Sequence, residues 1–183
     1  MSNRVFLDNN ATTIPSVEVQ VAIRSFSHWG NPSSIHSSGR AAKASILKVR
    51  RSLAESLNCT PGELIFTSGG SEANNMVVKG LLSKLKERGQ DTIVSSTVEH
   101  PALFKTLDQV EKLGFKIIRV PVGVEAGFDY DFLKKTLLEN KVGLVSVMQA
   151  NNETGEIFDL KKIRSLVDSV AVEKKIYFHS DMV

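Results

Sequence analysis

A histidine and an aspartate, His179 and Asp181, directly follow an apolar run in the closing stretch "KKIYFHSDMV". An apolar run of this length is typical of a buried strand. A carboxylate at the end of a central strand is costly to bury alone, because it loses its hydration without gaining a compensating partner. The position of Asp181 therefore predicts a cationic partner.

Two glycines and several small hydroxyl residues form the stretch "TSGGSE", between a strand-like and a helix-like segment. Free backbone N–H groups at a helix N-terminus favour an anion, so Gly70 and Ser71 are candidates for binding a phosphate group. The stretch has neither the lysine of a Walker A loop nor the GxGxxG pattern. The alternative is that Ser68 or Ser71 only caps the helix while the glycines turn the chain.

Polar side chains also follow two other strand-like segments. In "VEHPA", His100 precedes a helix opened by Pro101, where its ring is suited to stack on a ligand or to carry a proton near neutral pH. The stretch "QANNETG" supplies the amides of Gln149, Asn151 and Asn152, which suit fixed hydrogen bonds to a ligand oxygen. The alternatives are a surface histidine and an ordinary polar turn.

A single cofactor accounts for all of these groups. Pyridoxal 5'-phosphate offers a phosphate for the glycine turn, a flat ring for His100 and ring substituents for the amides. Its protonated pyridine nitrogen is the cation that Asp181 requires, and a carboxylate beside that nitrogen sustains electron withdrawal by the ring.

Two other sites compete with this interpretation. His179 and Asp181 stand at alternate strand positions and face one way, so with His100 and Glu99 they are candidate metal ligands. No second histidine pair or cysteine cluster completes such a set, and we expect no metal. A dinucleotide-binding domain is the other competitor, but its glycine fingerprint and its ribose-binding acid are missing.

The elements that must position these residues alternate along the chain. Strands are predicted at residues 63–68, 91–97, 115–122, 142–150 and 176–181, and helices at 71–88, 101–114, 129–140 and 159–175. Such alternation predicts an α/β fold, with a mostly parallel sheet and helices on both faces. Ligands bind beyond the carboxyl ends of parallel strands, which is where the candidate side chains stand.

The first 58 residues show a different pattern of predicted secondary structure. Two helices are predicted at residues 15–29 and 38–58, joined by the polar loop "GNPSSIHSS", and no strand pattern appears there. We therefore divide the chain into an N-terminal arm with two helices, residues 1–58, and the first part of a cofactor-binding domain, residues 59–183.

Composition excludes several other classes of protein. The 183 residues are 42% hydrophobic and 23% charged, as in a soluble globular domain. The formal net charge is 23 − 20 = +3 with the basic residues dispersed, so we expect no nucleic-acid partner. No apolar run approaches the ~20 residues of a membrane span, and the start lacks a signal-peptide pattern. With the lone Cys59, these features predict a cytoplasmic protein.

Six stretches in one order resemble a known family: "FLDNNATT", "GNPSSIHSSGRAA", "IFTSGGSEANN", "VEHPA", "VSVMQANNETG" and "FHSD". Along its whole length the chain is similar to the N-terminal part of the NifS/IscS-type cysteine desulfurases. These are class V aminotransferases with the type I fold of pyridoxal-phosphate enzymes. The loop "GNPSSIHSSG" together with "NNETG" resembles the NifS/IscS branch rather than the SufS-type branch.

The resemblance implies a role for each candidate residue. Gly70 and Ser71 would bind the cofactor phosphate. His100 would stack on the ring and move protons. Asn151 would contact the ring-hydroxyl side, and Asp181 would pair with the ring nitrogen. The residues on the substrate side would be Asn9, Ala11, Thr12 and Asn31.

The implied reaction converts L-cysteine to L-alanine and leaves the sulfur on an enzyme thiol as a persulfide, for iron–sulfur clusters or thio-cofactors. The implied partners are a second copy of the chain and an iron–sulfur scaffold protein. In such enzymes the Schiff-base lysine and the nucleophilic cysteine come later than the residue matched by Asp181. The first hypothesis is therefore the N-terminal portion of an enzyme that needs a companion segment, and the second is a non-catalytic truncated homologue acting as a binding or assembly module.

Overall fold

The computed structural model describes residues 5–9, 11–27, 29–124, 127–171 and 175–182. The chain forms two compact units, Met1–Phe66 and Thr67–Val183. The boundary between them falls later than the division predicted after residue 58, and the assignment of an arm and a cofactor domain stays a prediction. We describe the two units separately.

The N-terminal unit holds two helices and a short 3-10 turn: α1 (Val17–Ser25), α2 (Ser37–Ser56) and η1 (Pro61–Glu63). Both predicted helices are confirmed. Ser16 caps α1 by accepting a hydrogen bond from the Val19 backbone nitrogen, and His36 caps α2 in the same way through Nδ1.

A four-stranded parallel sheet forms the centre of the second unit. Its strands are β1 (Thr92–Ser96), β2 (Lys116–Val120), β5 (Val142–Ser146) and β6 (Tyr177–His179), in the order β2-β1-β5-β6. All three strand pairs are parallel, which confirms the predicted α/β class. Every residue of β1 and β5 is buried, as expected for central strands covered on both faces.

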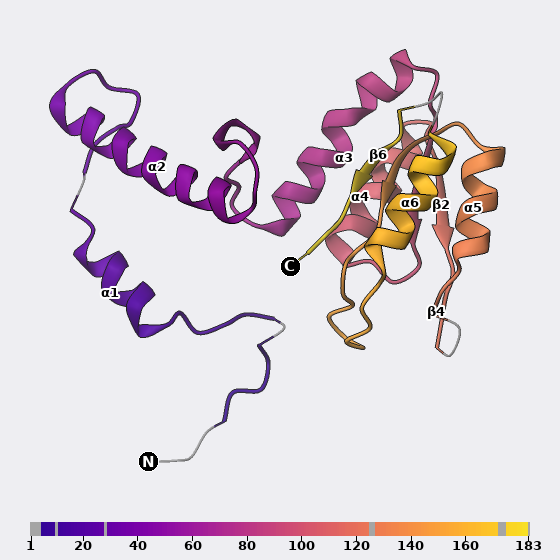
Figure 1. Ribbon diagram of the computed structural model, residues 1–183, viewed down its shortest axis with the longest axis horizontal. Coiled ribbons are helices and arrows are strands. Elements are labelled where there is room, and N and C mark those ends of the chain that lie inside the picture. The colour runs from indigo at the N-terminus through magenta and orange to yellow at the C-terminus, as the bar shows by residue number, and fades with distance from the viewer. Residues whose placement is uncertain (1–4, 10, 28, 125–126, 172–174, 183) are drawn as a thin grey trace. The chain divides into compact units, whose positions relative to one another are not determined.

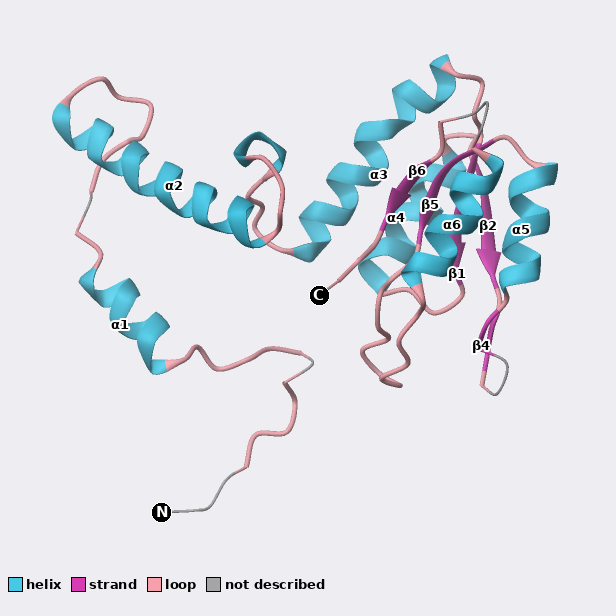
Figure 2. Ribbon diagram, in the orientation of Figure 1, coloured by secondary structure: helices cyan, strands magenta, loops and turns pink. Residues whose placement is uncertain are grey.

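Helices cover the two faces of this sheet in pairs, as Figures 1 and 2 show. One pair is α3 (Gly70–Glu87) with α4 (Pro101–Lys112), whose apolar side chains form one core with residues such as Ile93 and Leu144. The other pair is α5 (Tyr130–Glu139) with α6 (Leu160–Val170), which packs on Val94 and Val145. Because successive residues of a strand point to opposite faces of the sheet, neighbouring side chains of one strand pack in different cores.

Local signals explain where these helices begin and end. Asp129 and Asp159 cap α5 and α6, and their carboxylates accept hydrogen bonds from the Phe132 and Lys162 backbone nitrogens at 2.8 and 2.9 Å. Pro101 stands at the first position of α4, where its missing N–H is not needed. The positive φ of Gly114, just beyond α4, ends that helix in a conformation that glycine adopts without strain.

The strand predicted at residues 63–68 is wrong. Residues 64–67 are irregular, and Ile65 and Phe66 are largely exposed. No strand of the described chain pairs with them, and a strand needs a partner to satisfy its backbone groups. The Arg50 guanidinium instead donates to the Leu64 and Pro61 carbonyls and lies 4.7 Å above the centre of the Phe66 ring.

An antiparallel hairpin of β3 (Val122–Gly123) and β4 (Gly127–Phe128) follows β2, whereas the sequence predicted one strand over 115–122 and none over 123–128. These strands are too short to show a period-2 pattern, so the sequence carries no signal for them.

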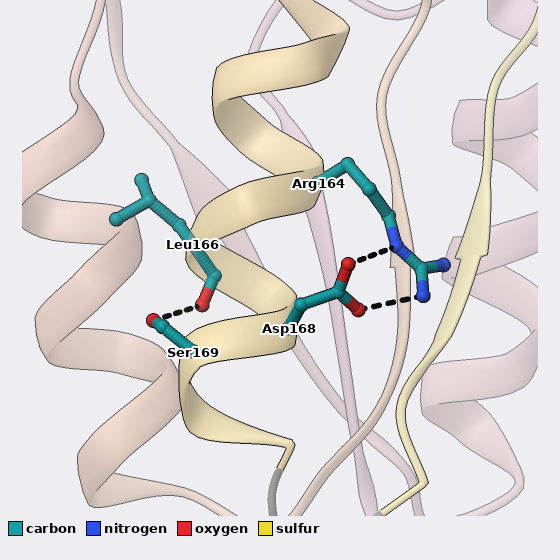
Figure 3. A network of polar contacts seen from close by, with 4 residues as sticks. All are labelled: Arg164, Leu166, Asp168 and Ser169. Atoms are coloured by element: carbon teal, nitrogen blue, oxygen red, sulfur yellow. Dashed lines mark hydrogen bonds and ion pairs between the residues drawn. The ribbon is translucent and has the colours of Figure 1, made fainter.

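On the solvent side of α6, Arg164 and Asp168 form a two-pronged ion pair, with Nε and Nη2 2.8 and 2.6 Å from the two carboxylate oxygens (Figure 3). Both side chains are about half exposed, and a pair four residues apart on a helix surface contributes only about 0.3–0.5 kcal/mol. The position of α6 therefore depends on its buried face, through Ile163 and Val167.

Within the described residues, no helix is both long enough and apolar enough to cross a membrane.

Candidate functional site

Three segments of the second unit meet at the carboxyl edge of its sheet. The Gln149 backbone nitrogen donates to the Asp181 carbonyl at 2.8 Å, which joins the segments that follow β5 and β6. The Asn151 side-chain amide donates to the Val98 carbonyl at 3.0 Å, which joins the same segment after β5 to the one after β1. The convergence expected for a ligand site in a parallel sheet is therefore present.

Asp181 lies at this edge with its side chain only partly exposed. Its Oδ2 accepts a hydrogen bond of 2.8 Å from the Asn74 side-chain amide, which comes from the first turns of α3. Asn74 itself is buried, with 3% of its surface exposed. The carboxylate at the end of β6 is thus tied directly to the helix whose N-terminus carries the predicted phosphate-binding residues.

Glu99 places a second carboxyl group close to Asp181. It is 5% exposed, and it accepts hydrogen bonds from the Ser96 hydroxyl and from the Met148 backbone nitrogen. Burial raises the pKa of Glu99 to about 7. Hydrogen bonds from Ser96 and Met148 oppose this rise, and the charge of Asp181 adds to it. Near neutral pH, the Glu99 carboxyl group is therefore partly protonated in the folded protein.

His179 is partly buried and hydrogen-bonds with a residue of the neighbouring strand. Its Nδ1 lies 2.8 Å from Oγ of the fully buried Ser146 on the neighbouring strand. Burial lowers the pKa of His179, and the Asp181 carboxylate acts in the opposite direction. This histidine therefore favours the neutral form, with Ser146 as its hydrogen-bond partner.

His100 caps α4, and its ring is exposed. Nδ1 accepts a hydrogen bond of 3.1 Å from the Ala102 backbone nitrogen, so a neutral ring carries its proton on Nε2. The cap fixes the tautomer and the base of the ring. The opposite nitrogen, Nε2, is therefore the one left for the predicted proton-transfer role.

Asn151 organises the turn after β5. Its Oδ1 accepts from the Glu153 and Thr154 backbone nitrogens, both at 2.9 Å, and from the Thr154 hydroxyl at 3.2 Å. Its side-chain nitrogen donates one hydrogen bond to the Val98 carbonyl and lies 3.8 Å from the sulfur of Met148. A ligand contact through Asn151 would therefore use the amide nitrogen, not the oxygen.

Gly70 and Ser71 are the first two residues of α3. Ser68 precedes them, and its backbone nitrogen and hydroxyl both donate hydrogen bonds to the Glu72 carboxylate, each at 2.6 Å. These bonds lower the pKa of Glu72. Ser68 is thus held by Glu72, while the helix N-terminus retains the first N–H groups that no intrahelical carbonyl can reach. These N–H groups suit an anion such as phosphate.

The predicted substrate-side residues Asn9, Ala11, Thr12 and Asn31 all belong to the N-terminal unit and are exposed. The backbone nitrogens of Ala11 and Thr12 both bond to the Asp8 carbonyl, at 3.3 and 3.4 Å. The Asn31 side chain accepts from the Ser33 backbone nitrogen at 2.9 Å. A substrate role for these residues stays a prediction.

The loop "GNPSSIHSSG" folds back on the start of α2. A Cβ on Gly30 would stand 2.5 Å from the Ser38 carbonyl oxygen, and one on Gly39 would collide with the Ser34 and Asn31 carbonyls. The two glycines are therefore required by close backbone approach. This packing, with the His36 cap, fixes the loop that presents Asn31.

Among the residues that the structure describes, no three histidine, cysteine, aspartate or glutamate side chains gather as metal ligands would. Cys59 is partly buried and belongs to the N-terminal unit.

The donor set of the second unit fits pyridoxal 5'-phosphate. The N-terminus of α3 suits the phosphate, and the carboxylate of Asp181, which accepts a hydrogen bond from the Asn74 amide, suits a cationic ring nitrogen. His100 adds a ring with its proton on the outer nitrogen.

The sequence did not single out Asn74, and it suggested Glu99 only as a candidate metal ligand. Asn74 stands on the apolar stripe of α3 with Val78 and Leu85, so the available signal was a polar residue at a buried helical position. Glu99 adjoins His100, and nothing in its sequence neighbourhood marks it as buried.

Comparison with known proteins identifies the family. Residues 5–183 match the Aminotransferase class-V family. The chain is 41% identical to cysteine desulfurase IscS of Dictyoglomus turgidum over 185 residues, which cover all of this chain and 45% of that protein. It is 39% identical to a cysteine desulfurase of Sinorhizobium fredii, covering 98% of this chain and 46% of that protein. The chain thus spans about half the length of the curated relatives it matches.

Solved structures agree with this assignment. A NifS-like protein superposes with a TM-score of 0.90 at 32% identity, covering 98% of this chain and 49% of the other. "SspA in complex with cysteine" superposes with a TM-score of 0.79 at 27% identity. The fold is that of the NifS-like, type I pyridoxal-phosphate enzymes, and enzymes of this family depend on pyridoxal 5'-phosphate. The chain belongs to the class-V aminotransferase family.

Proposed function

We propose that this chain is the cofactor-binding portion of a pyridoxal-phosphate-dependent cysteine desulfurase, which converts L-cysteine to L-alanine and an enzyme persulfide. The observation that carries the proposal is the bond between Asn74 and Asp181. It joins the strand-end carboxylate to the helix whose first residues suit a phosphate. The similarity to cysteine desulfurases over the whole chain supports the substrate.

Each residue has a physical task in this proposal. Gly70 and Ser71, with their backbone N–H groups, bind the phosphate. Asp181 binds the ring nitrogen and favours its protonated form. Bound there, the cofactor supplies an electron sink for the bonds at the substrate's α-carbon.

The remaining candidates act around the ring. His100 stacks on it and donates or accepts a proton at Nε2, while Ala102 holds the other ring nitrogen. Asn151 donates its amide hydrogen to the ring-hydroxyl side. The residues assigned to the substrate side are Asn9, Ala11, Thr12 and Asn31.

Complete activity needs a lysine and a thiol nucleophile that we do not assign to any residue of this chain. We therefore propose that it works with a companion segment or chain, in a homodimeric, cytoplasmic enzyme that delivers sulfur to an iron–sulfur scaffold protein. The alternative is a non-catalytic homologue that acts as a binding or assembly module.

Equilibrium dialysis with pyridoxal 5'-phosphate and an assay of alanine release from L-cysteine test the proposal. The chain should retain the cofactor, and inorganic phosphate should compete with it. Alanine should form only when the companion segment is supplied. Failure to bind the cofactor would contradict the proposal, and binding without alanine release in the presence of the companion would favour the non-catalytic alternative.

A further inference from the structure

Asn74 lies at a junction that the proposed reaction does not by itself explain. It is buried at 3% exposure on α3, three residues after Ser71, and its amide reaches Asp181, 107 positions further along the chain. A helix rises 1.5 Å per residue, so the Asn74 backbone stands about 4.5 Å along the axis from that of Ser71. One rigid turn therefore connects the predicted phosphate-binding residues with the side chain that holds Asp181.

The chemistry of an amide suits this place. A lysine or arginine in the place of Asn74 would itself bring a positive charge to Asp181. An asparagine N–H binds one carboxylate oxygen and brings no charge of its own, so this hydrogen bond orients Asp181. Among the described residues, two ionisable neighbours of Asp181 are Glu99, whose pKa is raised in part by Asp181, and His179, which favours the neutral form.

We propose that Asn74 is a positioning residue that sets Asp181 at a fixed separation from the N-terminus of α3, so that one rigid ligand carrying a phosphate and a protonated ring nitrogen satisfies both ends at once. This inference rests on the proposed cofactor role of Asp181. To that role it adds Asn74, the residue that adjusts the distance between the two ends of the site to the length of the ligand.

Two ligands that differ only at the ring nitrogen separate this role from simple stabilisation. Pyridoxine 5'-phosphate has the nitrogen, and its carba analogue has a C–H in that place. Neither has an aldehyde, so neither requires a lysine. The quantity measured by calorimetry is the ratio of the two dissociation constants. If Asn74 had a purely structural role, replacing it would weaken the binding of both ligands equally and leave the ratio of their dissociation constants unchanged.

The wild-type chain should bind pyridoxine 5'-phosphate at least ~10-fold more tightly than the carba analogue, as expected for a hydrogen-bonded charge pair. Asn74→Ala should reduce this preference about 5- to 10-fold while the dissociation constant of inorganic phosphate stays the same. Asn75→Ala is the matched control. Its amide donates to the Ser71 carbonyl and not to a carboxylate, so the preference should persist.

A double exchange, Asn74→Asp with Asp181→Asn, restores an amide–carboxylate hydrogen bond with its ends reversed. The midpoint of urea unfolding should recover relative to Asn74→Asp, and the nitrogen preference should not. If Asn74→Ala does not fold, Asn74→Ser keeps a small polar group at the site and must show the same loss of preference.

The outcomes distinguish the positioning role of Asn74 from the proposed function of the chain. If Asp181→Asn abolishes the preference and Asn74→Ala or Asn74→Ser retains the wild-type ratio, the positioning role is refuted and the proposed function stands. If the wild-type chain shows no preference for pyridoxine 5'-phosphate over the carba analogue, or if Asp181→Asn keeps the wild-type ratio, the proposed function fails, and the positioning role fails with it.

Discussion

The Glu99 carboxylate and the Met148 backbone nitrogen join the ends of β1 and β5 across 49 positions of the chain. Both carboxylate oxygens lie 3.1 Å from that nitrogen. The contact buries an ionisable group beside Asp181, and burial is the main cause of its raised pKa. The same contact that connects the two loops therefore makes the stability of the second unit depend on pH.

Replacing Glu99 with glutamine should change the pH profile of unfolding. The carboxyl has its ordinary pKa of 4.5 in the unfolded chain and about 7 when folded. Below pH 4.5 both states are protonated. As pH rises toward 7 the unfolded chain ionises first, so the wild type loses stability relative to Glu99→Gln, by up to about 3 kcal/mol. Urea unfolding between pH 4.5 and 8 measures the difference.

The exposed Glu111 on α4 provides the control for this experiment. Glu111→Gln should leave the profile of the wild type unchanged. Parallel profiles for the wild type and Glu99→Gln would show that folding does not raise the pKa of Glu99.

Two buried serines allow a matched test of the hydrogen bond to His179. Ser146 and Ser95 face each other in the β1–β5 register, and both are fully buried. Ser146→Ala leaves His179 Nδ1 without its partner and should cost about 1–3 kcal/mol. Ser95 Oγ has no hydrogen-bond partner among the described residues, so Ser95→Ala should be nearly neutral. Equal losses of unfolding free energy would contradict this account.

Two glycines should respond to alanine in opposite directions. A Cβ on Gly143 would stand 2.5 Å from Leu85 Cδ2 and 3.0 Å from Gln90 Cβ, so Gly143→Ala should destabilise the chain by about 1–3 kcal/mol. Gly80 lies within α3 with open space at the Cβ position, and Gly80→Ala should stabilise by about 0.5–1 kcal/mol. Thermal unfolding of the two variants checks both signs. A stable Gly143→Ala variant would mean that α3 shifts easily on the sheet.

Much of the second unit was predictable because its elements repeat a simple physical pattern. The strand-like stretch 142–150 is mostly apolar, and the helix-like stretch 101–114 carries a proline at its start and a glycine at its end. The segment 63–68 shows where this reasoning fails. It has strand-like composition, but whether it forms a strand depends on a partner, which local sequence does not encode.

The candidate site divides in the same way. Asp181 was predictable because a carboxylate after an apolar strand is costly to bury. Its partner Asn74 was not, because a contact across 107 positions leaves no local trace beyond one polar residue in a buried stripe. The burial of Glu99 likewise arises only when the segments after β1 and β5 meet.

The ring nitrogen itself provides the most direct test of the account. Nitrogen-15-labelled pyridoxine 5'-phosphate, bound to the wild-type chain and to Asp181→Asn, reports the protonation of that nitrogen through its chemical shift. We predict a protonated nitrogen in the wild type, retained at pH values where the free ligand has lost its proton, and an unprotonated one in Asp181→Asn. The same shift in both proteins would contradict the claim that Asp181 binds the cofactor ring.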